Sequence, residues 1–507
     1  MARDLAVDEE RHPMSLSRRQ LFGLSGGVVA GVALGACGVA LTAPGGSTGA
    51  VLPSEVPLPK PFTTDLPPLA TARTRPLRGG GRKGTLTTRR RGTEILPGRT
   101  TEIAGYDGTF PGPLLEATKG EPLHLTLRNE LDHPVVNHLH GGVTPPRDDG
   151  YPTDLVGPGT SRVYRYPLRQ RAATLWYHDH TMDLTGPNVY AGLAGGFVLR
   201  DPAEEDLGLP RQERELTLVL TDRSFGEDAQ LLYPMTEHGI ERRYHGGLLG
   251  DCMLVNGAPW PRTDVDAARY RVRVLNACNA RRLELALDPG GEIVQVGTDQ
   301  GLLTRPHRRR SLTLAPAERA DVVIDFSAYR VGQQVTLVNR LGDGDMGLVM
   351  RFDVARRGKD DSRVPERLSV IDPIDPSRVV RTRDFHLALG KPMPSGHGSH
   401  SGGDRSLPMW SINGQPYRPG HDLFTAELGT VERWRITTDV HHPVHAHLVH
   451  FQVEQDGAPA WKDTVDVGPA SRAEVLVPIE GYRGRYVMHC HNLEHEDRMM
   501  MADWSVV

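Results

Sequence analysis

The stretch that decides how this chain folds is residues 489–495, which reads HCHNLEH and is followed five residues later by Met500. In a β-strand successive side chains point to opposite faces, so Cys490 points one way and the two histidines beside it point the other. His495 and Met500 lie in the following loop and can fold back to the Cys490 side. A thiolate, two imidazoles and a weak axial thioether are the ligands of a blue-copper electron-transfer site. The alternation of ligands along this one strand therefore predicts two adjacent metal centres that form an electron relay.

Three further histidine motifs supply the ligands that the second centre needs. Residues 138–140 and 178–180 are His-x-His pairs, and residues 442–447 read HPVHAH. On a strand, residues i and i+2 place two imidazoles on one face, which suits the ligation of adjacent metals. With His442 assigned to the blue site, six of these histidines remain, and His489 and His491 bring the number to eight, enough for three ions. Imidazole-rich sites favour copper among the first-row metals.

In this order, the four motifs resemble the copper signatures of the multicopper oxidases, and all twelve ligand positions match without substitution. The resemblance is closest to the branch that contains bacterial spore-coat laccases, bilirubin oxidase and phenoxazinone synthase. It extends from about Pro57 to Val507. Four segments carry it around the histidines: HLHGGVTP at 138–145, WYHDH at 176–180, NVYAGL at 188–193 and LAPAER at 314–319.

The resemblance implies four copper ions and a role for each ligand. The type 1 copper would be held by His442, Cys490, His495 and axial Met500. The type 2 copper would take His138 and His445. One type 3 copper would take His140, His178 and His491, and the other His180, His447 and His489.

Two acidic residues stand where the spore-coat laccases carry carboxylates that assist proton delivery. Asp149 comes nine residues after His140, and Glu496 directly follows His495. A carboxylate near the cluster can relay protons to dioxygen if its pKa is tuned. The alternatives are that Asp149 is a turn residue in the segment RDDGYP and that Glu496 forms a salt bridge in the ligand loop.

Length and composition predict an all-β chain of several domains. A chain of 507 residues is too long for one hydrophobic core, and about three domains is the expectation. Alternating runs at 122–127, 215–220 and 270–275 predict strands, which 56 glycines and 40 prolines punctuate. The net charge is only −4, and the one basic run, Arg73 to Arg91, is predicted to be a solvated arm. Nucleic acid is therefore not an expected partner.

A repeated motif predicts three consecutive cupredoxin-like Greek-key β-sandwiches. VNGAPWP at 255–261 recurs as INGQPYRP at 412–419, and YDGTFPGP at 106–113 occupies the matching place before an earlier strand. The spacing, on the order of 150 residues, is a normal domain length. The expected divisions are domain 1 at 57–205, domain 2 at 206–355, a linker at 356–382 and domain 3 at 383–507. Ligands fall only in domains 1 and 3, so the three-copper cluster must lie between them, and domain 2 is a spacer that helps to shape substrate access.

Residues 1–56 are predicted to hold an export signal and a flexible tether. Arg18 and Arg19 precede an apolar stretch that ends at Ala36, the pattern of a twin-arginine signal. The segment LGAC resembles a lipobox, whose cleavage would leave Cys37 as a diacylated membrane anchor. Cleavage by ordinary signal peptidase at a nearby small residue is the alternative. The protein is therefore expected outside the cytoplasm, either anchored at the cell surface or secreted.

Several other cysteines and histidines receive no role in the copper sites. Cys252 and Cys278 can form a disulfide in an exported chain or remain buried thiols, and the sequence leaves both open. His441 and His450 are predicted not to be ligands. The loop at 396–402, rich in His, Gly and Ser, is predicted to be solvated.

The function that these motifs predict is a laccase-like oxidase. It would take single electrons from phenolic or other aromatic small molecules at the type 1 copper and reduce dioxygen to water at the cluster. The alternative is a metallo-oxidase that acts on Cu(I) or Mn(II). A copper carrier without activity is disfavoured by the full ligand set, and nitrite reductases lack the eight-imidazole cluster. An axial methionine predicts a lower potential than Leu or Phe would give, and so easily oxidised donors. The oligomeric state is not predicted.

Overall fold

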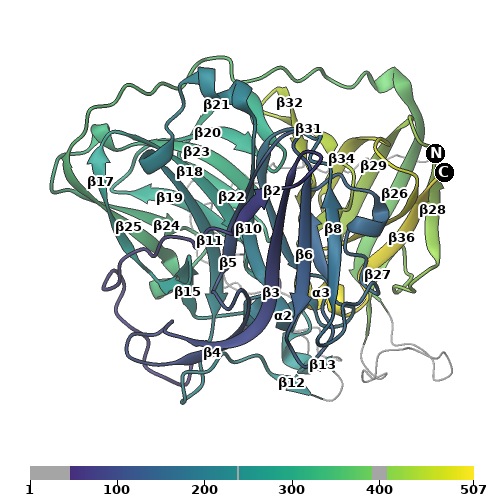
Figure 1. Ribbon diagram of the computed structural model, residues 1–507, viewed down its shortest axis with the longest axis horizontal. Helices are drawn as coiled ribbons and strands as arrows, with labels where there is room; N and C mark the ends of the chain where they lie inside the picture. The colour runs from purple at the N-terminus through teal and green to yellow at the C-terminus, as the bar shows by residue number, and fades with distance from the viewer. Residues whose placement is uncertain (1–45, 237–238, 391–407) are drawn as a thin grey trace, which may run out of the picture.

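The computed structural model describes residues 46–236, 239–390 and 408–507 (Figure 1). The chain forms three consecutive cupredoxin-like β-sandwiches, which confirms the predicted all-β class. The predicted export signal and Cys37 lie outside the described residues, as does the loop at 396–402. Among the described residues, no helix is long and apolar enough to cross a membrane.

The first sandwich pairs a five-stranded and a four-stranded sheet. The first sheet has the order β2 (Thr74–Pro76), β3 (Arg82–Thr93), β6 (Leu123–Asn129), β8 (Ser161–Tyr166), with β4 (Thr101–Tyr106) beside β3. The second has the order β5 (Gly112–Thr118), β10 (Ala194–Arg200), β9 (Ala173–Asp179), β7 (Asn137–His140). Strand β6 shows why these segments form strands: its leucines alternate with polar residues, and the leucines are buried in the core.

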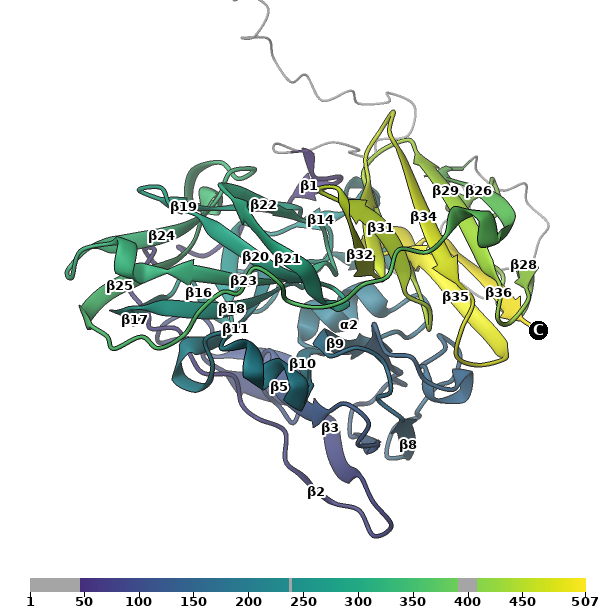
Figure 2. The same ribbon diagram turned by 90° about the horizontal axis from the view of Figure 1, so that it is seen from above.

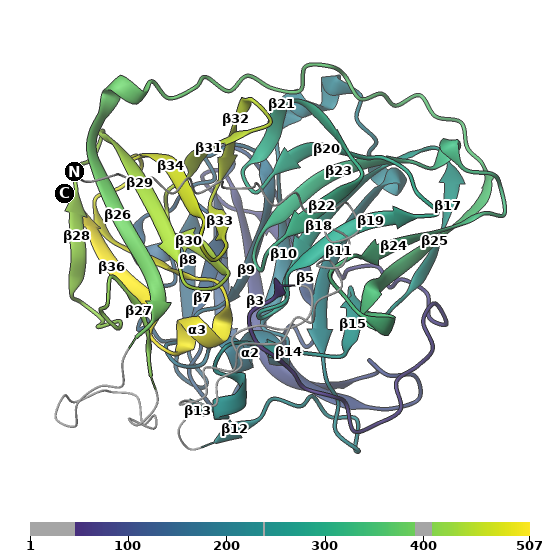
Figure 3. The ribbon, with the colours of Figure 1, turned by 180° about the vertical axis from the view of Figure 1, so that it is seen from behind.

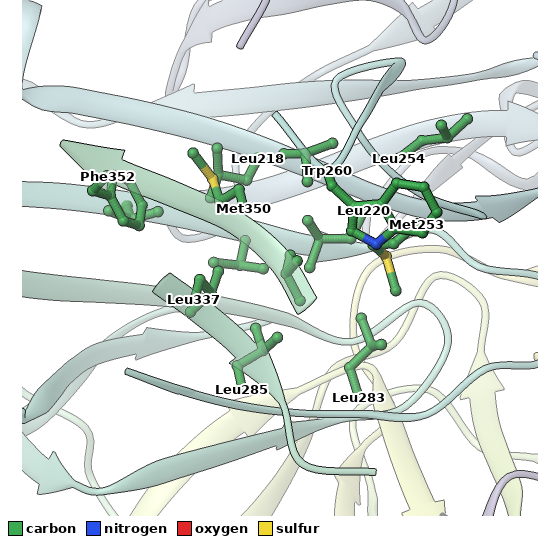
Figure 4. Close-up of a cluster of buried hydrophobic side chains, with 14 of the residues drawn as sticks. Leu218, Leu220, Met253, Leu254, Trp260, Leu283, Leu285, Leu337, Met350 and Phe352 are labelled. Atoms are coloured by element: carbon green, nitrogen blue, oxygen red, sulfur yellow. The ribbon is translucent and has the colours of Figure 1, made fainter. Parts of the chain in front are cut away.

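The second sandwich pairs a seven-stranded and a five-stranded sheet. The order of the first is β16 (Ala258–Pro259), β15 (Cys252–Val255), β11 (Glu215–Arg223), β18 (Arg269–Asn276), β23 (Arg319–Asp325), β20 (Ile293–Thr298), β21 (Gly301–Arg309). The order of the second is β17 (Arg262–Ala267), β25 (Leu348–Arg357), β24 (Gln334–Asn339), β19 (Leu283–Asp288), β22 (Ser311–Leu314). Figure 4 shows its core, in which Leu218, Leu285 and Phe352 pack between the two sheets.

The third sandwich pairs a six-stranded and a five-stranded sheet. The order of the first is β27 (Trp410–Ile412), β26 (Val379–Leu389), β29 (Val431–Thr438), β34 (Arg472–Pro478), β31 (Phe451–Gln455), β32 (Ala458–Lys462). The order of the second is β28 (Asp422–Ala426), β36 (Met501–Val506), β35 (Gly484–Cys490), β30 (His442–Ala446), β33 (Thr464–Val467). Between β25 and β26 the chain crosses from the second sandwich to the third along one edge of the molecule (Figure 3).

The three sandwiches pack against one another around a shared centre (Figure 2). Helix α2 (Thr185–Ala191) of the first packs against helix α3 (Leu493–Asp497) of the third, and β21 of the second contacts β32 of the third. A small apolar cluster contains Trp176 of the first sandwich, Leu275 of the second and Leu493 of the third. The interface between the first and third sandwiches is therefore held in place by contacts with the second.

Part of the predicted tether packs onto the globular body. Strand β1 (Ala50–Val51) pairs in parallel with β14 (Leu248–Leu249), next to the short hairpin of β12 (Met235–Thr236) and β13 (Gly239–Ile240). Gly49 makes this possible, because a Cβ at that position would collide with the backbone of Gly247. The small residues that suggest a flexible tether thus serve a close backbone contact in residues 46–56.

Candidate metal centres

Strand β35 is the frame on which both predicted centres are built. It pairs with β30 so that Val444 faces Cys490 and His445 faces His489, and it pairs with β36 on its other edge. Every residue from Tyr486 to Cys490 is fully buried. Because side chains alternate across the sheet, Cys490 and His489 point to opposite faces, as the sequence predicts.

On one face, His442, Cys490 and His495 form a compact group. The Cys490 Sγ lies 3.3 Å from His442 Nδ1 and 3.6 Å from His495 Nδ1, and the two nitrogens are 3.0 Å apart. Ligand atoms that each lie about 2.0–2.3 Å from one ion are separated by about 3–4 Å. The three atoms are therefore spaced as ligands of a single metal ion.

The far nitrogens of these imidazoles are fixed by hydrogen bonds. His442 Nε2 donates to Asp439 Oδ1 at 2.9 Å, and His495 Nε2 donates to the Gly246 carbonyl at 3.0 Å. The Trp410 ring lies 3.7 Å from the His495 ring, and its Nε1 donates to the His245 carbonyl at 2.9 Å. Such outer partners set which nitrogen faces the metal. The second sandwich thus orients a ligand of the third.

The environment of the Cys490 thiol suits a metal ligand. Burial is the main cause that raises its pKa well above the usual range, so the free thiol would keep its proton. A bound cation replaces that proton outright. The Asn492 backbone N–H also donates to Cys490 Sγ at 3.4 Å, which stabilises a thiolate.

Met500 is placed on the Cys490 side, and its two methionine neighbours are not. Met500 is fully buried in the same apolar cluster as Cys490. Met499 and Met501 pack in a different cluster, with Tyr417 and Val487. Of the three methionines, Met500 is therefore the one available as the axial ligand.

On the other face of β35, eight buried histidines gather at the interface of the first and third sandwiches. The first supplies His138, His140, His178 and His180, and the third supplies His445, His447, His489 and His491. Two groups coincide with the predicted type 3 sites: His140, His178 and His491, and His180, His447 and His489. His138 and His445, the predicted type 2 pair, join His140 in a further group.

Unpartnered nitrogens show that this cluster fits metal ions. Buried nitrogens without a hydrogen-bond partner occur on His138, His140, His178, His445 and His491. Each unsatisfied buried polar atom costs about 1–3 kcal/mol. Burial lowers the pKa of His178, His445 and His447 well below the usual range, so each ring keeps a free lone pair. Neutral imidazoles directed at one another are a ligand set for the three copper ions that the sequence implies.

One ligand is oriented differently from the others. His138, His178 and His445 donate their Nδ1–H to backbone carbonyls at 2.8–2.9 Å, which leaves Nε2 facing the cluster. His140 Nε2 instead lies 3.1 Å from both Asp463 Oδ1 and Thr464 Oγ1, so its N–H points out of the cluster, and its Nδ1 is the unpartnered nitrogen. The His140 ring therefore needs a side-chain acceptor that the other three do not.

The two predicted acidic residues both contact ligands. Asp149 Oδ2 accepts a hydrogen bond from His447 Nδ1 at 2.8 Å, and Asp149 Oδ1 lies 3.2 Å from His138 Nδ1. Glu496 Oε2 lies 3.0 Å from His489 Nδ1, and its Oε1 lies 3.4 Å from His180 Nδ1. Burial alone would raise the pKa of Glu496, but these imidazoles outweigh it and lower the pKa. Each carboxylate thus bridges two imidazoles of the cluster.

The residues predicted to be non-ligands contact other groups. His441 reaches Asp466, and His450 Nε2 donates to the Gly141 carbonyl at 3.0 Å. Cys252 and Cys278 are buried free thiols, which resolves the open question of their pairing. Asp439, Trp410 and Asp463 could not be identified from the sequence, because no motif marks residues that act through another side chain.

Comparisons with known proteins agree with this geometry. A family model described as "Multicopper oxidase" matches residues 88–204, and a second with the same description matches residues 392–507. A laccase of Bacillus subtilis (strain 168) is 36% identical over 478 residues, which cover 80% of this chain and 90% of that protein. A bilirubin oxidase of Albifimbria verrucaria is 34% identical over 443 residues, which cover 80% of this chain and 73% of that protein. The crystal structure of a laccase from Pediococcus acidilactici matches with a TM-score of 0.78 at 28% identity, covering 90% of this chain and 96% of its own.

Proposed function

The chain belongs to the multicopper oxidase family and is a copper-dependent oxidoreductase with oxygen as the acceptor, and we propose that its reducing substrates are phenolic and other aromatic small molecules. The division of β35 and its loop between two buried centres supports the electron relay, and the observation that carries the choice of donor is the partly exposed Asp439 carboxylate bonded to His442. Bound copper would supply one-electron oxidation at the Cys490 side and four-electron reduction of dioxygen at the histidine side. The backbone of residues 489–491 joins the two sides by the shortest covalent path.

We assign the ligands as the resemblance implies. His442, Cys490, His495 and Met500 hold the type 1 copper, and the eight histidines of the cluster hold the other three. Asp149 and Glu496 are proposed to pass protons to the cluster, since each is hydrogen-bonded or close to two ligand imidazoles instead of occupying a ligand position.

The surroundings of His442 support an aromatic donor. His495 is covered by Trp410 and the Gly246 carbonyl, whereas His442 is bonded to Asp439, whose side chain is 32% exposed. A phenol that approaches here can give its proton to the Asp439 carboxylate as it loses an electron. Across the described residues, which leave out 1–45, 237–238 and 391–407, each group of three or more potential ligands contains histidines of the two copper centres, and one of these groups also contains Asp149. The partly exposed Asp439 carboxylate beside His442 is what favours an aromatic donor over Cu(I) or Mn(II), the alternative substrates.

Steady-state kinetics on the copper-loaded protein test the choice of donor. We expect a higher kcat/KM for a phenolic donor than for Cu(I) or Mn(II), and the reverse order would assign the protein to the metallo-oxidases. Asp439→Asn should keep the blue colour and lower kcat/KM for phenols by about 100-fold, the lower end of what a positioned proton acceptor contributes. Asp466→Asn is the matched control, because Asp466 contacts His441 and Arg282 but no ligand.

We further propose export by the twin-arginine route and anchoring through a lipidated Cys37. Residues 46–51 lie beside the blue centre, where Thr48 Oγ1 donates to the His441 carbonyl at 3.2 Å. Gly46 comes nine positions after Cys37, and the chain between them can span at most about 30 Å. An anchored chain would thus keep the donor side near the membrane. Detergent-phase partitioning and N-terminal mass analysis of the mature protein test this. A soluble form that begins after Ala40 would exclude the anchor.

A further inference from the structure

A buried carboxylate outside the proposed ligand set joins all three sandwiches beside the cluster. Asp463, in the turn between β32 and β33, is fully buried. Arg319 of the second sandwich donates two parallel hydrogen bonds to it, from Nη1 to Oδ1 at 2.7 Å and from Nη2 to Oδ2 at 2.5 Å. Gln300 Nε2 also donates to Oδ2, at 2.5 Å. The oxygen that faces the first sandwich accepts the Nε2–H of His140.

The same residue fixes a second histidine of the cluster. The backbone carbonyl of Asp463 accepts the Nδ1–H of His445 at 2.8 Å. The rings of His140 and His445 stack at 3.6 Å between centroids. One residue therefore orients a ligand from the first sandwich through its side chain and a ligand from the third through its backbone.

The glycine after His140 is explained by this arrangement. Gly141 has a φ of 82°, and a Cβ there would lie 2.6 Å from Asp463 Oδ2 and 2.9 Å from Arg319 Nη2. No side chain fits between His140 and the buried ion pair. The backbone of the first sandwich has to pass directly against Arg319 and Asp463.

We propose that Asp463, held by Arg319, is a positioning residue that fixes the reversed orientation of His140, so that the second sandwich helps to build the copper cluster without supplying a ligand. A carboxylate paired to a guanidinium in a bidentate fork accepts hydrogen bonds and donates none. It therefore requires the proton of His140 on Nε2 and directs the Nδ1 lone pair at the cluster. This inference rests on the proposed ligand role of His140 and is independent of the donor.

The informative variant is Asp463→Asn, which keeps the shape and replaces one acceptor oxygen with a donor NH2. Oδ2 accepts from Arg319 and Gln300, and Oδ1 accepts from Arg319 and faces His140 and Thr464. The amide orientation that keeps the two short bonds to Oδ2 on oxygen therefore turns the NH2 toward His140. We expect the His140 proton to move to Nδ1, the blue colour to persist, copper to be lost from the cluster and oxygen turnover to fall by about 10- to 100-fold. Selective ¹⁵N-histidine NMR on the copper-free protein shows which ring nitrogen of His140 carries the proton. The His140→Ala variant serves to assign the His140 signals.

Asp321→Asn is the matched control. Asp321 is a buried carboxylate of the second sandwich that also accepts a bidentate arginine, Arg271, at 2.5–3.0 Å and contacts no histidine of the cluster. It should weaken the fold similarly and keep all four coppers. Equal copper loss in both variants would reduce Asp463 to a general stabilising residue and overturn the proposal, as would a fully copper-loaded Asp463→Asn protein with unchanged turnover.

A second variant covers the case in which Asp463→Asn does not accumulate. Arg319→Lys keeps the positive charge but cannot form the fork, so we expect partial copper loss with the blue centre intact. Full copper content in Arg319→Lys would overturn the proposal. His140→Ala separates this inference from the ligand assignment. If His140→Ala itself keeps all four coppers, the ligand role of His140 is wrong, whereas copper loss in His140→Ala alone refutes only the role of Asp463.

Discussion

The blue centre is assembled within one sandwich, whereas the eight-histidine cluster is assembled between two. All four proposed blue-site ligands lie in residues 442–500, on β30, at the end of β35 and in the loop that contains α3. The cluster takes half its histidines from the first sandwich, about 300 residues earlier in the chain. Folding of the third sandwich alone can bring the blue ligands together, but the cluster also needs the first sandwich to dock correctly. The two centres should therefore fail separately when single residues are changed.

The largest difference between the effects on the two centres is expected in the Cys490→Ser variant. Among the residues that the structure describes, Cys490 provides the only thiol beside His442 and His495, so this variant should be colourless and should oxidise donors no faster than copper-free protein. The cluster histidines lie on the opposite face and should still bind copper. Visible absorption and copper analysis measure both outcomes. A Cys490→Ser protein that stays blue would mean that the blue centre lies elsewhere.

The reciprocal change is His489→Ala. The His489 side chain points away from Cys490 and toward His180 and His447, so the blue colour should persist. Oxygen turnover should fall by more than about 100-fold, because loss of an outer partner alone costs about 10- to 100-fold. His441→Ala is the matched control, since His441 adjoins a ligand but its Nδ1 faces Asp466 at 3.4 Å. Loss of blue absorbance with intact turnover would contradict the face assignment.

A smaller effect, confined to the blue centre, is expected from Met500→Leu. Removal of the weak axial donor should raise the reduction potential while copper content and fold are kept. Met499→Leu should leave the potential unchanged, because Met499 packs in a separate cluster with Tyr417 and Val487. Redox titration of both variants decides the matter. A rise in Met499→Leu instead would move the axial ligand by one residue.

The smallest effect is expected at Cys252 and Cys278, which belong to neither centre. Both are buried free thiols, and burial is the largest cause that raises their pKa well above the usual range. A thiol reductant should therefore leave the Tm of the copper-free protein unchanged. A native disulfide contributes about 2–5 kcal/mol, and its reduction would lower the Tm by at least about 4 °C. A drop of that size would show that the two cysteines pair after all.

The comparison of the two centres also explains what the sequence could predict. The local period of a strand placed Cys490 and His489 on opposite faces, and the His-x-His pairs gave the histidines that gather in the cluster. The fold class followed from alternating runs and a repeated motif. These signals are local in the sequence, so they can be recognised without knowledge of the tertiary structure.

The contacts between sandwiches could not be predicted in the same way. The Gly246 carbonyl orients His495, and Arg319 reaches Asp463, although no spacing rule connects residues from different domains. Residues 46–56 looked like a tether because small and flexible residues also serve close packing. The second sandwich, expected to be a spacer that shapes substrate access, touches the surroundings of both centres.

Anaerobic reductive titration tests most directly whether β35 joins two separate copper centres. Fully loaded wild-type protein should accept four electrons, one for each copper, and bleach its blue band during the titration. His489→Ala should keep the blue band and accept fewer electrons, down to about one if the whole cluster is lost. A variant that still accepts four electrons and turns over oxygen normally would contradict the account, because His489 would then have no part in a second centre.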